Sequence, residues 1–266
     1  MKTCTVQTVL NAVFKFAPKK FAEDWDNVGL LVGDCEAEVK KFFVCLDVLD
    51  ENISQAVELG AELIVSHHPM IFRKMSDVRL DKPLGRHIAR LIKNDISVIA
   101  AHTNLDKASG GVNDVLANRL GLVDVKVPDD EEFSFVRLGK LPTPMTAADF
   151  ARHVKKSLNA ENVRLVDAGD FMIERVGLVG GAGADYILNA QFHGAQAFVT
   201  GDVKYHDAQV AVENRIHVVD AGHFATEFPI VHALAEYLRD ELKKFPVEVV
   251  EDTRSKDFFT TVEFVS

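Results

Sequence analysis

The chain has 266 residues, of which 47% are hydrophobic and 26% charged. This composition matches folded domains and excludes a disordered tail protein, and the length allows two compact domains or one large α/β domain. Forty acidic against thirty basic side chains give a formal net charge of -10. Such a charge disfavours nucleic acid as a partner, because binding to the phosphate backbone depends on many Lys and Arg contacts.

Targeting signals and cysteine usage point to the cytoplasm. The N-terminal stretch lacks the long apolar segment of a signal peptide, and no apolar run approaches the ~20 residues needed to cross a bilayer. Cys4, Cys35 and Cys45 form neither a Cys-x-x-Cys pair nor an even-numbered disulfide framework. We therefore expect free thiols, a cytoplasmic protein and no membrane partner.

The first half of the chain is expected to alternate strands and helices. Apolar residues at helical spacing predict an opening helix from Thr5 to Ala17, which stops at Pro18. From residue 42 onward, apolar runs of strand length alternate with amphipathic stretches of helix length. The expected strands are Phe42 to Asp47, Leu63 to Ser66 and Ile96 to Ala100, and the expected helices are Ile53 to Leu59, Leu84 to Lys93 and Val112 to Leu120. This βαβαβ order predicts a parallel sheet covered by helices.

A second α/β domain is expected after the polar stretch Pro128 to Glu132, which is of the kind that separates domains. Its expected strands are Phe135 to Leu138, Val163 to Asp167, Arg175 to Val179, Ala197 to Thr200 and His217 to Asp220, and its helices are Thr146 to Leu158, Asp185 to Phe192 and Tyr205 to Glu213. A long final helix should end near Lys244, and the tail alternates like a strand pair. We assign residues 1–127 together with about 221–266 to a first domain and 128–220 to a second. Both are expected to be α/β, with mainly parallel sheets covered by helices.

Candidate metal ligands follow three of the expected strands. In open parallel sheets the ligand crevice lies at the carboxyl ends of the strands, so polar residues directly after strands are the first to consider. Three such segments contain imidazoles and carboxylates suited to zinc, manganese or iron: Ser66-His-His-Pro69, His102-Thr-Asn-Leu-Asp106 and His223-Phe-Ala-Thr-Glu227. Together they offer His67, His68, Asp106, His223 and Glu227.

Five ligands are too many for one open zinc site, and they suit two metal ions ~3.5–4 Å apart with one bridging carboxylate. We expect two divalent ions in a cleft at the carboxyl ends of the strands, with most ligands in the first domain. A single histidine after a strand is more often a hydrogen-bonded loop residue than a ligand, so the prediction depends on the three segments occurring together. His223 and Glu227 share one face if their segment is helical. Pro229 then requires either that the helix starts near Thr226 or that it is irregular there.

Other polar residues have more than one interpretation. His102 and His206 are candidates for proton transfer. Asp202 either supports a ligand or caps a helix. The segment Gly180-Gly-Ala-Gly183 could bind an anion through its amides, but it lacks the dinucleotide spacing, and a tight turn fits it better. Trp25 to Gly29 fits either a structural turn or a pocket wall.

The combination of motifs resembles the Nif-three-like family, whose members often carry the name GTP cyclohydrolase 1 type 2. The matching motifs, in chain order, are Trp25-Asp-Asn-Val-Gly-Leu30, Ser66-His-His-Pro69, His102-Thr-Asn-Leu-Asp106, Gly201-Asp202 and Asp220-Ala-Gly-His-Phe-Ala-Thr-Glu227. The resemblance implies a two-domain α/β protein, a ring-shaped homohexamer and a dinuclear metal centre, in the compact form of the family without an inserted domain. It implies the same five ligands, with Glu227 bridging the ions.

Two functions fit these expectations. The first is a dinuclear metal-dependent hydrolase of a small anionic, nucleotide-like substrate, in which the ions lower the pKa of a water towards ~7 and His102 or His206 moves protons. The family name points to GTP, attacked at C8 of the guanine ring. The second is a non-enzymatic metal-binding or partner-binding regulatory ring, in which five ligands saturate the ions. An open coordination position separates the two functions, because catalysis needs a displaceable water.

Overall fold

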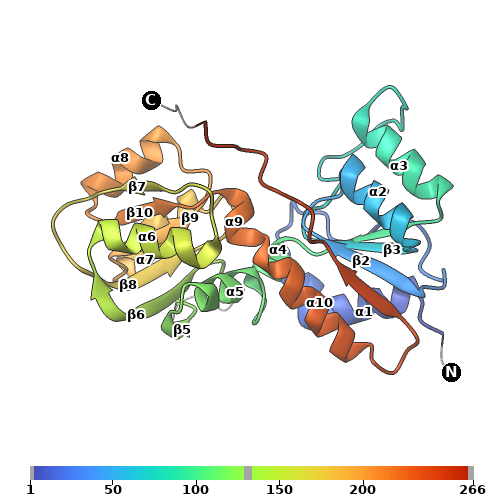
Figure 1. Cartoon of the computed structure of the whole chain (residues 1–266), viewed down its shortest axis with the longest axis horizontal. Helices are drawn as coiled ribbons and strands as arrows, with labels where there is room; N and C mark the ends of the chain where they lie inside the picture. Colours follow the sequence, from blue (N-terminus) through green and yellow to red (C-terminus); the bar gives the residue numbers. More distant parts are fainter. Residues whose placement is uncertain (1–2, 129–133, 263–266) are drawn as a thin grey trace. The chain divides into compact units, whose positions relative to one another are not determined.

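The computed structural model describes residues 3–128 and 134–262, and the chain divides into two compact units, each built on its own sheet (Figure 1). The first unit contains Met1–Gly111 and Ile230–Ser255. The second unit contains Val112–Pro229 and Lys256–Ser266. The α/β class with two helix-covered sheets, predicted from the sequence, is confirmed.

The first unit has a five-stranded sheet in the order β1-β4-β3-β2-β11. Its strands are β1 (Gly29–Val32), β2 (Lys41–Cys45), β3 (Leu63–Ser66), β4 (Ser97–Ala100) and β11 (Glu248–Glu251). All neighbours run parallel except β1, which pairs antiparallel with β4. The helices are α1 (Val6–Phe16), the short η1 (Lys19–Phe21), α2 (Asp50–Leu59), α3 (Pro83–Lys93), α4 (Thr103–Lys107) and α10 (Pro229–Glu241).

The central strands of this sheet are buried on both faces. Every residue of β3 and β4 is buried, and so are the last four residues of β2. Parallel strands covered by helices on both sides are expected to be continuous apolar runs, which is how β2 to β4 were recognised in the sequence. The polar residues that follow these strands therefore stand at the edge of a rigid apolar core.

The second unit has a six-stranded sheet in the order β5-β6-β8-β9-β10-β7. Its strands are β5 (Val123–Lys126), β6 (Arg137–Met145), β7 (Arg164–Val166), β8 (Ile173–Leu178), β9 (Ala197–Thr200) and β10 (His217–Asp220). Only β8, β9 and β10 run parallel, so this sheet is mixed. The helices are α5 (Val112–Arg119), α6 (Ala147–Leu158), η2 (Ala184–Tyr186), α7 (Ile187–Phe192), α8 (Tyr205–Glu213) and α9 (His223–Glu227).

Side chains that alternate along the central strands divide the apolar core of the second unit between the two faces of its sheet. Ala197 and Val199 of β9 pack with apolar residues of α5 and α6, whereas Phe198 packs with residues of α7 and α8. Successive strand residues point to opposite faces, so α5 and α6 cover one face and α7 and α8 the other. The sheet is therefore the middle layer of a three-layer unit.

Several elements differ from the sequence prediction. β1 and β5 were not predicted, and β5 is mostly exposed, so it lacks the apolar run that marks a buried strand. β6 continues through Pro142 and Pro144, where its pairing with β8 is irregular because proline has no amide hydrogen to donate. The tail contributes one strand within the described residues, β11, which pairs with β2 instead of forming a strand pair. Most of the predicted separator, Pro128 to Glu132, lies outside the described residues.

The chain also passes from one unit to the other at different positions from those predicted from the sequence. Instead of 127/128 and about 220/221, the divisions lie at 111/112 and 229/230, and the chain returns to the second unit after Ser255. The reason is packing: Leu116 of α5, Leu120 directly after α5 and Ala221 after β10 belong to the apolar core of the second unit. His223 and Glu227 therefore lie in the second unit and not in the first.

No helix within residues 3–128 and 134–262 has the length and apolar character needed to span a membrane.

A buried histidine in the second unit makes the stability of the fold depend on pH. His217 opens β10 and is fully buried, with its ring 4.1 Å from that of Phe171. Its Nδ1 accepts a hydrogen bond from the amide of Ala168 at 3.1 Å. Burial lowers the pKa of His217, and the carboxylate of Asp167, 3.4 Å from Nδ1, only partly offsets this effect.

We expect the protein to lose stability as pH falls below about 6.5, the ordinary histidine pKa. The unfolded chain binds a proton there more readily than the folded chain, so the free energy of unfolding decreases until the folded pKa is passed. Urea denaturation at pH values from about 7.5 to about 5.5 would measure how steeply the free energy of unfolding depends on pH. His217→Gln should flatten this dependence, whereas the control His206→Gln, at an exposed histidine of the same unit, should not. Equal slopes in wild type and His217→Gln would contradict the assignment.

Candidate functional site

Polar residues of the first unit follow three neighbouring parallel strands. Asp47 comes after β2, His67 and His68 after β3, and His102 after β4. The His-His pair is held by its own backbone: the amide of His67 donates to the Cys45 carbonyl at 3.2 Å, and that of His68 to the Leu46 carbonyl at 2.9 Å. The side chains therefore project from fixed backbone at the carboxyl end of the sheet.

Three imidazoles of the first unit form one cluster. The ring centroids of His67, His68 and His102 are 5.0 to 5.8 Å apart, and one ring nitrogen of each lies within 4.8 Å of the others. Asp106, on α4, places a carboxylate oxygen 3.5 Å from Nε2 of His67. The structure thus brings together the predicted ligands His67, His68 and Asp106, and it adds the predicted proton-transfer residue His102 to them.

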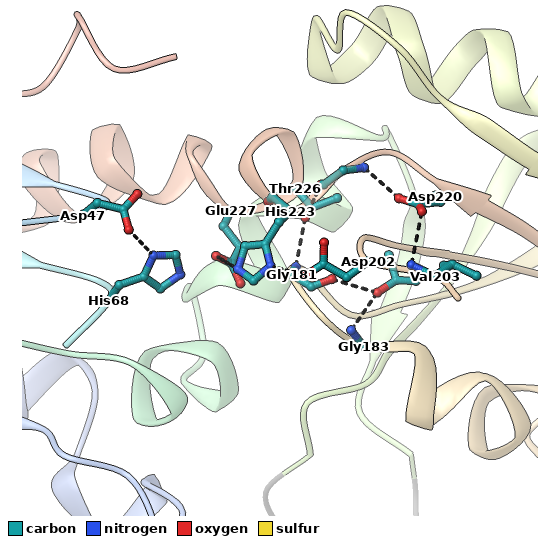
Figure 2. Close-up of polar contacts among 12 residues, drawn as sticks. Asp47, His68, Gly181, Gly183, Asp202, Val203, Asp220, His223, Thr226 and Glu227 are labelled. Atoms are coloured by element: carbon teal, nitrogen blue, oxygen red, sulfur yellow. Dashed lines mark hydrogen bonds and ion pairs between the residues drawn. The ribbon is translucent and has the colours of Figure 1, made fainter. Parts of the chain in front are cut away.

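Each imidazole of this cluster is oriented through its Nδ1 atom. Nδ1 of His67 donates to the carbonyl of Ala101 at 2.9 Å, Nδ1 of His68 to Asp47 at 2.8 Å (Figure 2), and Nδ1 of His102 to Asp26 at 2.9 Å. Carbonyls and carboxylates only accept, so in the neutral ring the proton is on Nδ1 and the lone pair on Nε2. Histidines that bind metals have this arrangement, in which the second nitrogen donates to an oxygen.

Asp26 belongs to the Trp25 to Gly29 motif, and its carboxylate connects the loop before β1 to α4. It accepts from His102 and from both the amide and the hydroxyl of Thr103. Burial of the side chain raises the pKa of Asp26, but the hydrogen bonds from His102 and Thr103 outweigh this and lower the pKa to about 2. Asp26 is therefore ionised at neutral pH and holds the His102 ring, so this part of the motif is more than a turn.

In the second unit, His223 and Glu227 lie one turn apart on α9. Nε2 of His223 is 3.0 Å from the Glu227 carboxylate, and Nδ1 is 2.8 Å from Asp202, which follows β9. The helix begins at His223 and ends at Glu227, and α10 starts separately at Pro229. Of the two possibilities that the sequence left, the irregular helix is correct, because Pro229 begins a new helix.

The glycine loop after β8 packs against this pair. A Cβ atom on Gly181 would lie 2.0 Å from Oε1 of Glu227 and 3.1 Å from Nε2 of His223, so a larger residue would force the Glu227 carboxylate to move (Figure 2). The amides of Gly180, Gly181 and Gly183 donate to Asn113, Thr226 and Thr200. Because these amides already have internal acceptors, the loop is a tight turn that borders the ligands, and it is not an anion cradle.

Some predicted roles are not supported by proximity, and one contributor was missed. His206 is exposed on α8, where it contacts Gln209 and Tyr205, and no cluster of candidate ligands within the described residues includes it. Asp202 does not cap α8, since the amide of Lys204 donates to Asp207 instead. The role of Asp47 was missed, although it follows β2 just as the predicted ligands follow their strands.

The donor set fits divalent metal ions. Imidazoles with Nδ1 protonated present Nε2 as the ligand atom, and the adjacent carboxylates of Asp106 and Glu227 supply oxygen ligands and negative charge. These residues are suited to bind a divalent metal ion. The same chemistry, an imidazole fixed by an oxygen acceptor, occurs independently in each unit.

Comparison with known proteins identifies the family. Residues 4–257 match Duf34/NIF3 (NGG1p interacting factor 3). The chain belongs to this family. A Bacillus cereus protein related to NIF3 has a similar structure, with a TM-score of 0.92 at 26% sequence identity over 98% of this chain and all of that one. The resemblance inferred from the motifs is confirmed.

Relatives of this Duf34/NIF3 member differ in length. A Clostridium perfringens protein named GTP cyclohydrolase 1 type 2 homolog is 37% identical over 255 residues, which cover 94% of this chain and 97% of that protein. A Halalkalibacterium halodurans protein of the same name is 28% identical over an alignment of 374 residues, with 98% of this chain and 100% of that protein covered. Since this chain has 266 residues, that relative contains additional sequence, as expected for the longer form of the family.

Gly181→Ala should displace the Glu227 carboxylate from His223. Gly121→Ala is the matched control, because Gly121 lies in the same unit at a similar φ (+66° against +63°) but has nothing within 4 Å of its Cβ position. Both substitutions should lower the free energy of unfolding by about 1–2 kcal/mol through left-handed backbone strain. Crystal structures should show a moved Glu227 only in Gly181→Ala. An unmoved carboxylate in that variant would contradict the close packing described above.

Proposed function

We propose that this Duf34/NIF3 protein binds two divalent ions in one dinuclear centre and hydrolyses a small anionic, nucleotide-like substrate. The proposed ligands are His67, His68, Asp106, His223 and Glu227, with Glu227 bridging, and the ions are zinc, manganese or iron. The observation that carries the proposal is that the three ligand imidazoles all donate through Nδ1 to an oxygen acceptor, which leaves Nε2 to coordinate a metal.

Bound at these ligands, divalent ions would supply Lewis-acid polarisation of a substrate oxygen and a water of lowered pKa. The protein's own groups orient the ligands and move protons. Asp47 and Asp202 fix the rings of His68 and His223. His102, held by the ionised Asp26, is the proposed proton-transfer group, and its contact with His67 and His68 supports that role. His206, exposed on α8 of the second unit, is the second proposed group for proton transfer.

The substrate class follows from charge and from the relatives. Three neutral imidazoles and two carboxylates leave two divalent ions with net positive charge, which favours a small anion. Relatives named GTP cyclohydrolase 1 type 2 homolog make GTP the first nucleotide to test. The alternative is a non-enzymatic metal-binding or partner-binding protein, in which the ligands saturate the ions.

We also propose that the protein forms a homo-oligomer in the cytoplasm, with a hexamer as the first assembly to test. Large apolar side chains are exposed on the second unit: Leu188 and Phe192 on α7, and Tyr205 at the start of α8. Leu188 and Phe192 are four residues apart and so share one face of α7. Exposed apolar groups on one face are typical of interaction surfaces. The three cysteines are free thiols, in keeping with a reducing compartment.

Metal analysis tests the centre itself. Protein prepared without chelator should contain about two divalent ions per chain. Glu227→Gln should reduce occupancy of both sites, whereas His68→Ala should affect mainly one. Asp202→Asn should lower metal affinity about 10–100-fold, because the charged acceptor of His223 becomes a neutral amide oxygen. The matched control Asp207→Asn removes a carboxylate that accepts from the Lys204 amide and should bind metal normally. One ion or none, not restored by added metal, would refute the dinuclear centre.

Turnover tests the hydrolase. Activity on GTP or another nucleotide should disappear with chelator and return with manganese or zinc. His102→Ala should lower kcat about 100-fold or more while leaving the metal content unchanged, because the loss is of proton transfer and not of ligation. Hydrolysis that persists without metals, or an unaffected kcat in metal-replete His102→Ala, would exclude this mechanism. Two bound ions with no turnover across nucleotides and phosphoesters would favour the binding-protein alternative.

Light scattering tests assembly. A hexamer should have a mass about six times the 29.4 kDa of the chain. Phe192→Asp should shift the mass downward, because it places a charge in the exposed apolar group on α7. A mass near 29.4 kDa at all concentrations would rule out the oligomer.

A further inference from the structure

Two large aromatic side chains of the first unit are exposed beside the histidine cluster. Trp25, in the loop before β1, is 60% exposed, and Phe72, in the loop after β3, is 49% exposed. Exposed aromatic side chains of this size leave much apolar surface in water, and an adjacent pair of them commonly marks a binding site. Neither the metal ligands nor the proposed proton transfer explains them.

These rings and His102 form a three-sided corner. The Trp25 and Phe72 rings are 5.8 Å apart at 78°, Trp25 and His102 6.4 Å at 73°, and Phe72 and His102 6.0 Å at 90°. Because the three planes are nearly perpendicular, one flat ring can stack on one wall and receive edge contacts from the other two. We refer to Trp25, Phe72 and His102 as the aromatic corner.

Hydrogen bonds hold the corner in shape. The side-chain amide of Asn27 donates to the carbonyl of Ile71 at 2.6 Å, which ties the Trp25 loop to the Phe72 loop. Asp26 ties the same loop to His102 and Thr103. A surface fixed in this way loses little conformational entropy when a ligand binds, which favours a small rigid partner.

Two cations lie on the Phe72 side of the corner. Arg73 and Lys74 directly follow Phe72 and are both exposed, in a chain whose net charge is -10. An aromatic platform beside two cations combines a surface for a planar base with attraction for a phosphate.

We propose that the aromatic corner binds the planar heterocyclic base of a nucleotide by stacking on Trp25 and Phe72. The base then lies against His102, the group assigned to proton transfer, and the phosphate is placed toward Arg73 and Lys74. The inference rests on the proposed function, since it names the substrate class of that site and the residues that select it. It makes Trp25 and Phe72 specificity-determining residues, and they take no part in metal binding.

The test uses Trp25 itself, because it is the only tryptophan of the chain. Guanosine monophosphate should quench the tryptophan emission of the metal-replete protein in a saturable manner. Ribose 5-phosphate, which lacks the base, should not quench it. Phe72→Leu should weaken binding of guanosine monophosphate about tenfold, since stacking on an aromatic side chain is lost. Phe72→Tyr keeps an aromatic face and should bind within about twofold of wild type.

Ile92→Ala is the matched control for loss of an exposed apolar side chain. Ile92 lies on α3 of the same unit and is 60% exposed, so its removal should leave binding unchanged. Equilibrium dialysis with Trp25→Leu gives a second readout that does not use fluorescence, and this variant should also bind guanosine monophosphate about tenfold more weakly.

The outcomes separate the two proposals. Base-dependent quenching without turnover would support the aromatic corner while the hydrolase fails. Turnover of nucleotides with unchanged KM in Phe72→Leu, or equal quenching by ribose 5-phosphate, would overturn the corner while the hydrolase stands. Emission that changes with protein concentration alone would show that a second copy of the chain covers the corner, and would also overturn it.

Discussion

The site residues depend on one interaction, the hydrogen bond from an imidazole Nδ1 to a fixed oxygen acceptor. It decides which ring nitrogen carries the proton and which presents a lone pair, and it restricts rotation of the ring. In His68, His102 and His223 the acceptor is an aspartate, and in His67 it is a backbone carbonyl. Each acceptor therefore fixes the direction in which the ring presents its free nitrogen.

Holding carboxylates near a folded core has a cost in desolvation, and the structure offsets it with donors. Asp26 has a fully buried side chain but accepts from His102 and Thr103, so the pKa of its carboxyl decreases instead of rising. Glu227 is also buried and lies 3.0 Å from Nε2 of His223, with Gly181 leaving room for its carboxylate. Both acids are therefore fixed by their neighbours rather than solvated, as residues of a preorganised site should be.

The sequence predicts the central elements well because they are buried on both faces. β3, β9 and β10 have the bounds that their apolar runs and flanking residues indicate. Edge elements such as β5 escaped prediction, since an exposed strand lacks an apolar run. The unit boundaries differ from the predicted ones because Leu116 and Leu120 pack in the apolar core of the second unit. The local sequence pattern of α5 does not indicate in which unit the helix packs.

The candidate site residues were predicted from their position directly after strands. This criterion finds residues that neighbouring strands bring together. His67, His68, His102 and Asp106 meet for that reason. His206 was selected from the segment after β9, but α8 begins at Tyr205 and exposes it. The orienting role of Asp47 was missed because a single aspartate after a strand has no motif of its own. Its importance comes only from the register of β2 with β3.

The register of neighbouring parallel strands explains why an aspartate orients a histidine in both units. Cys45 and Ser66, the last residues of β2 and β3, are partners in the ladder, and so are Thr200 and Asp220, the last residues of β9 and β10. Parallel strands that end level with each other place the residues after them side by side. An aspartate after one strand then reaches a histidine after the next: Asp47 to His68 in the first unit, and Asp202 to His223 in the second. Two sheets with different edges and topologies thus orient an imidazole in the same way, because level strand ends are all that this arrangement requires.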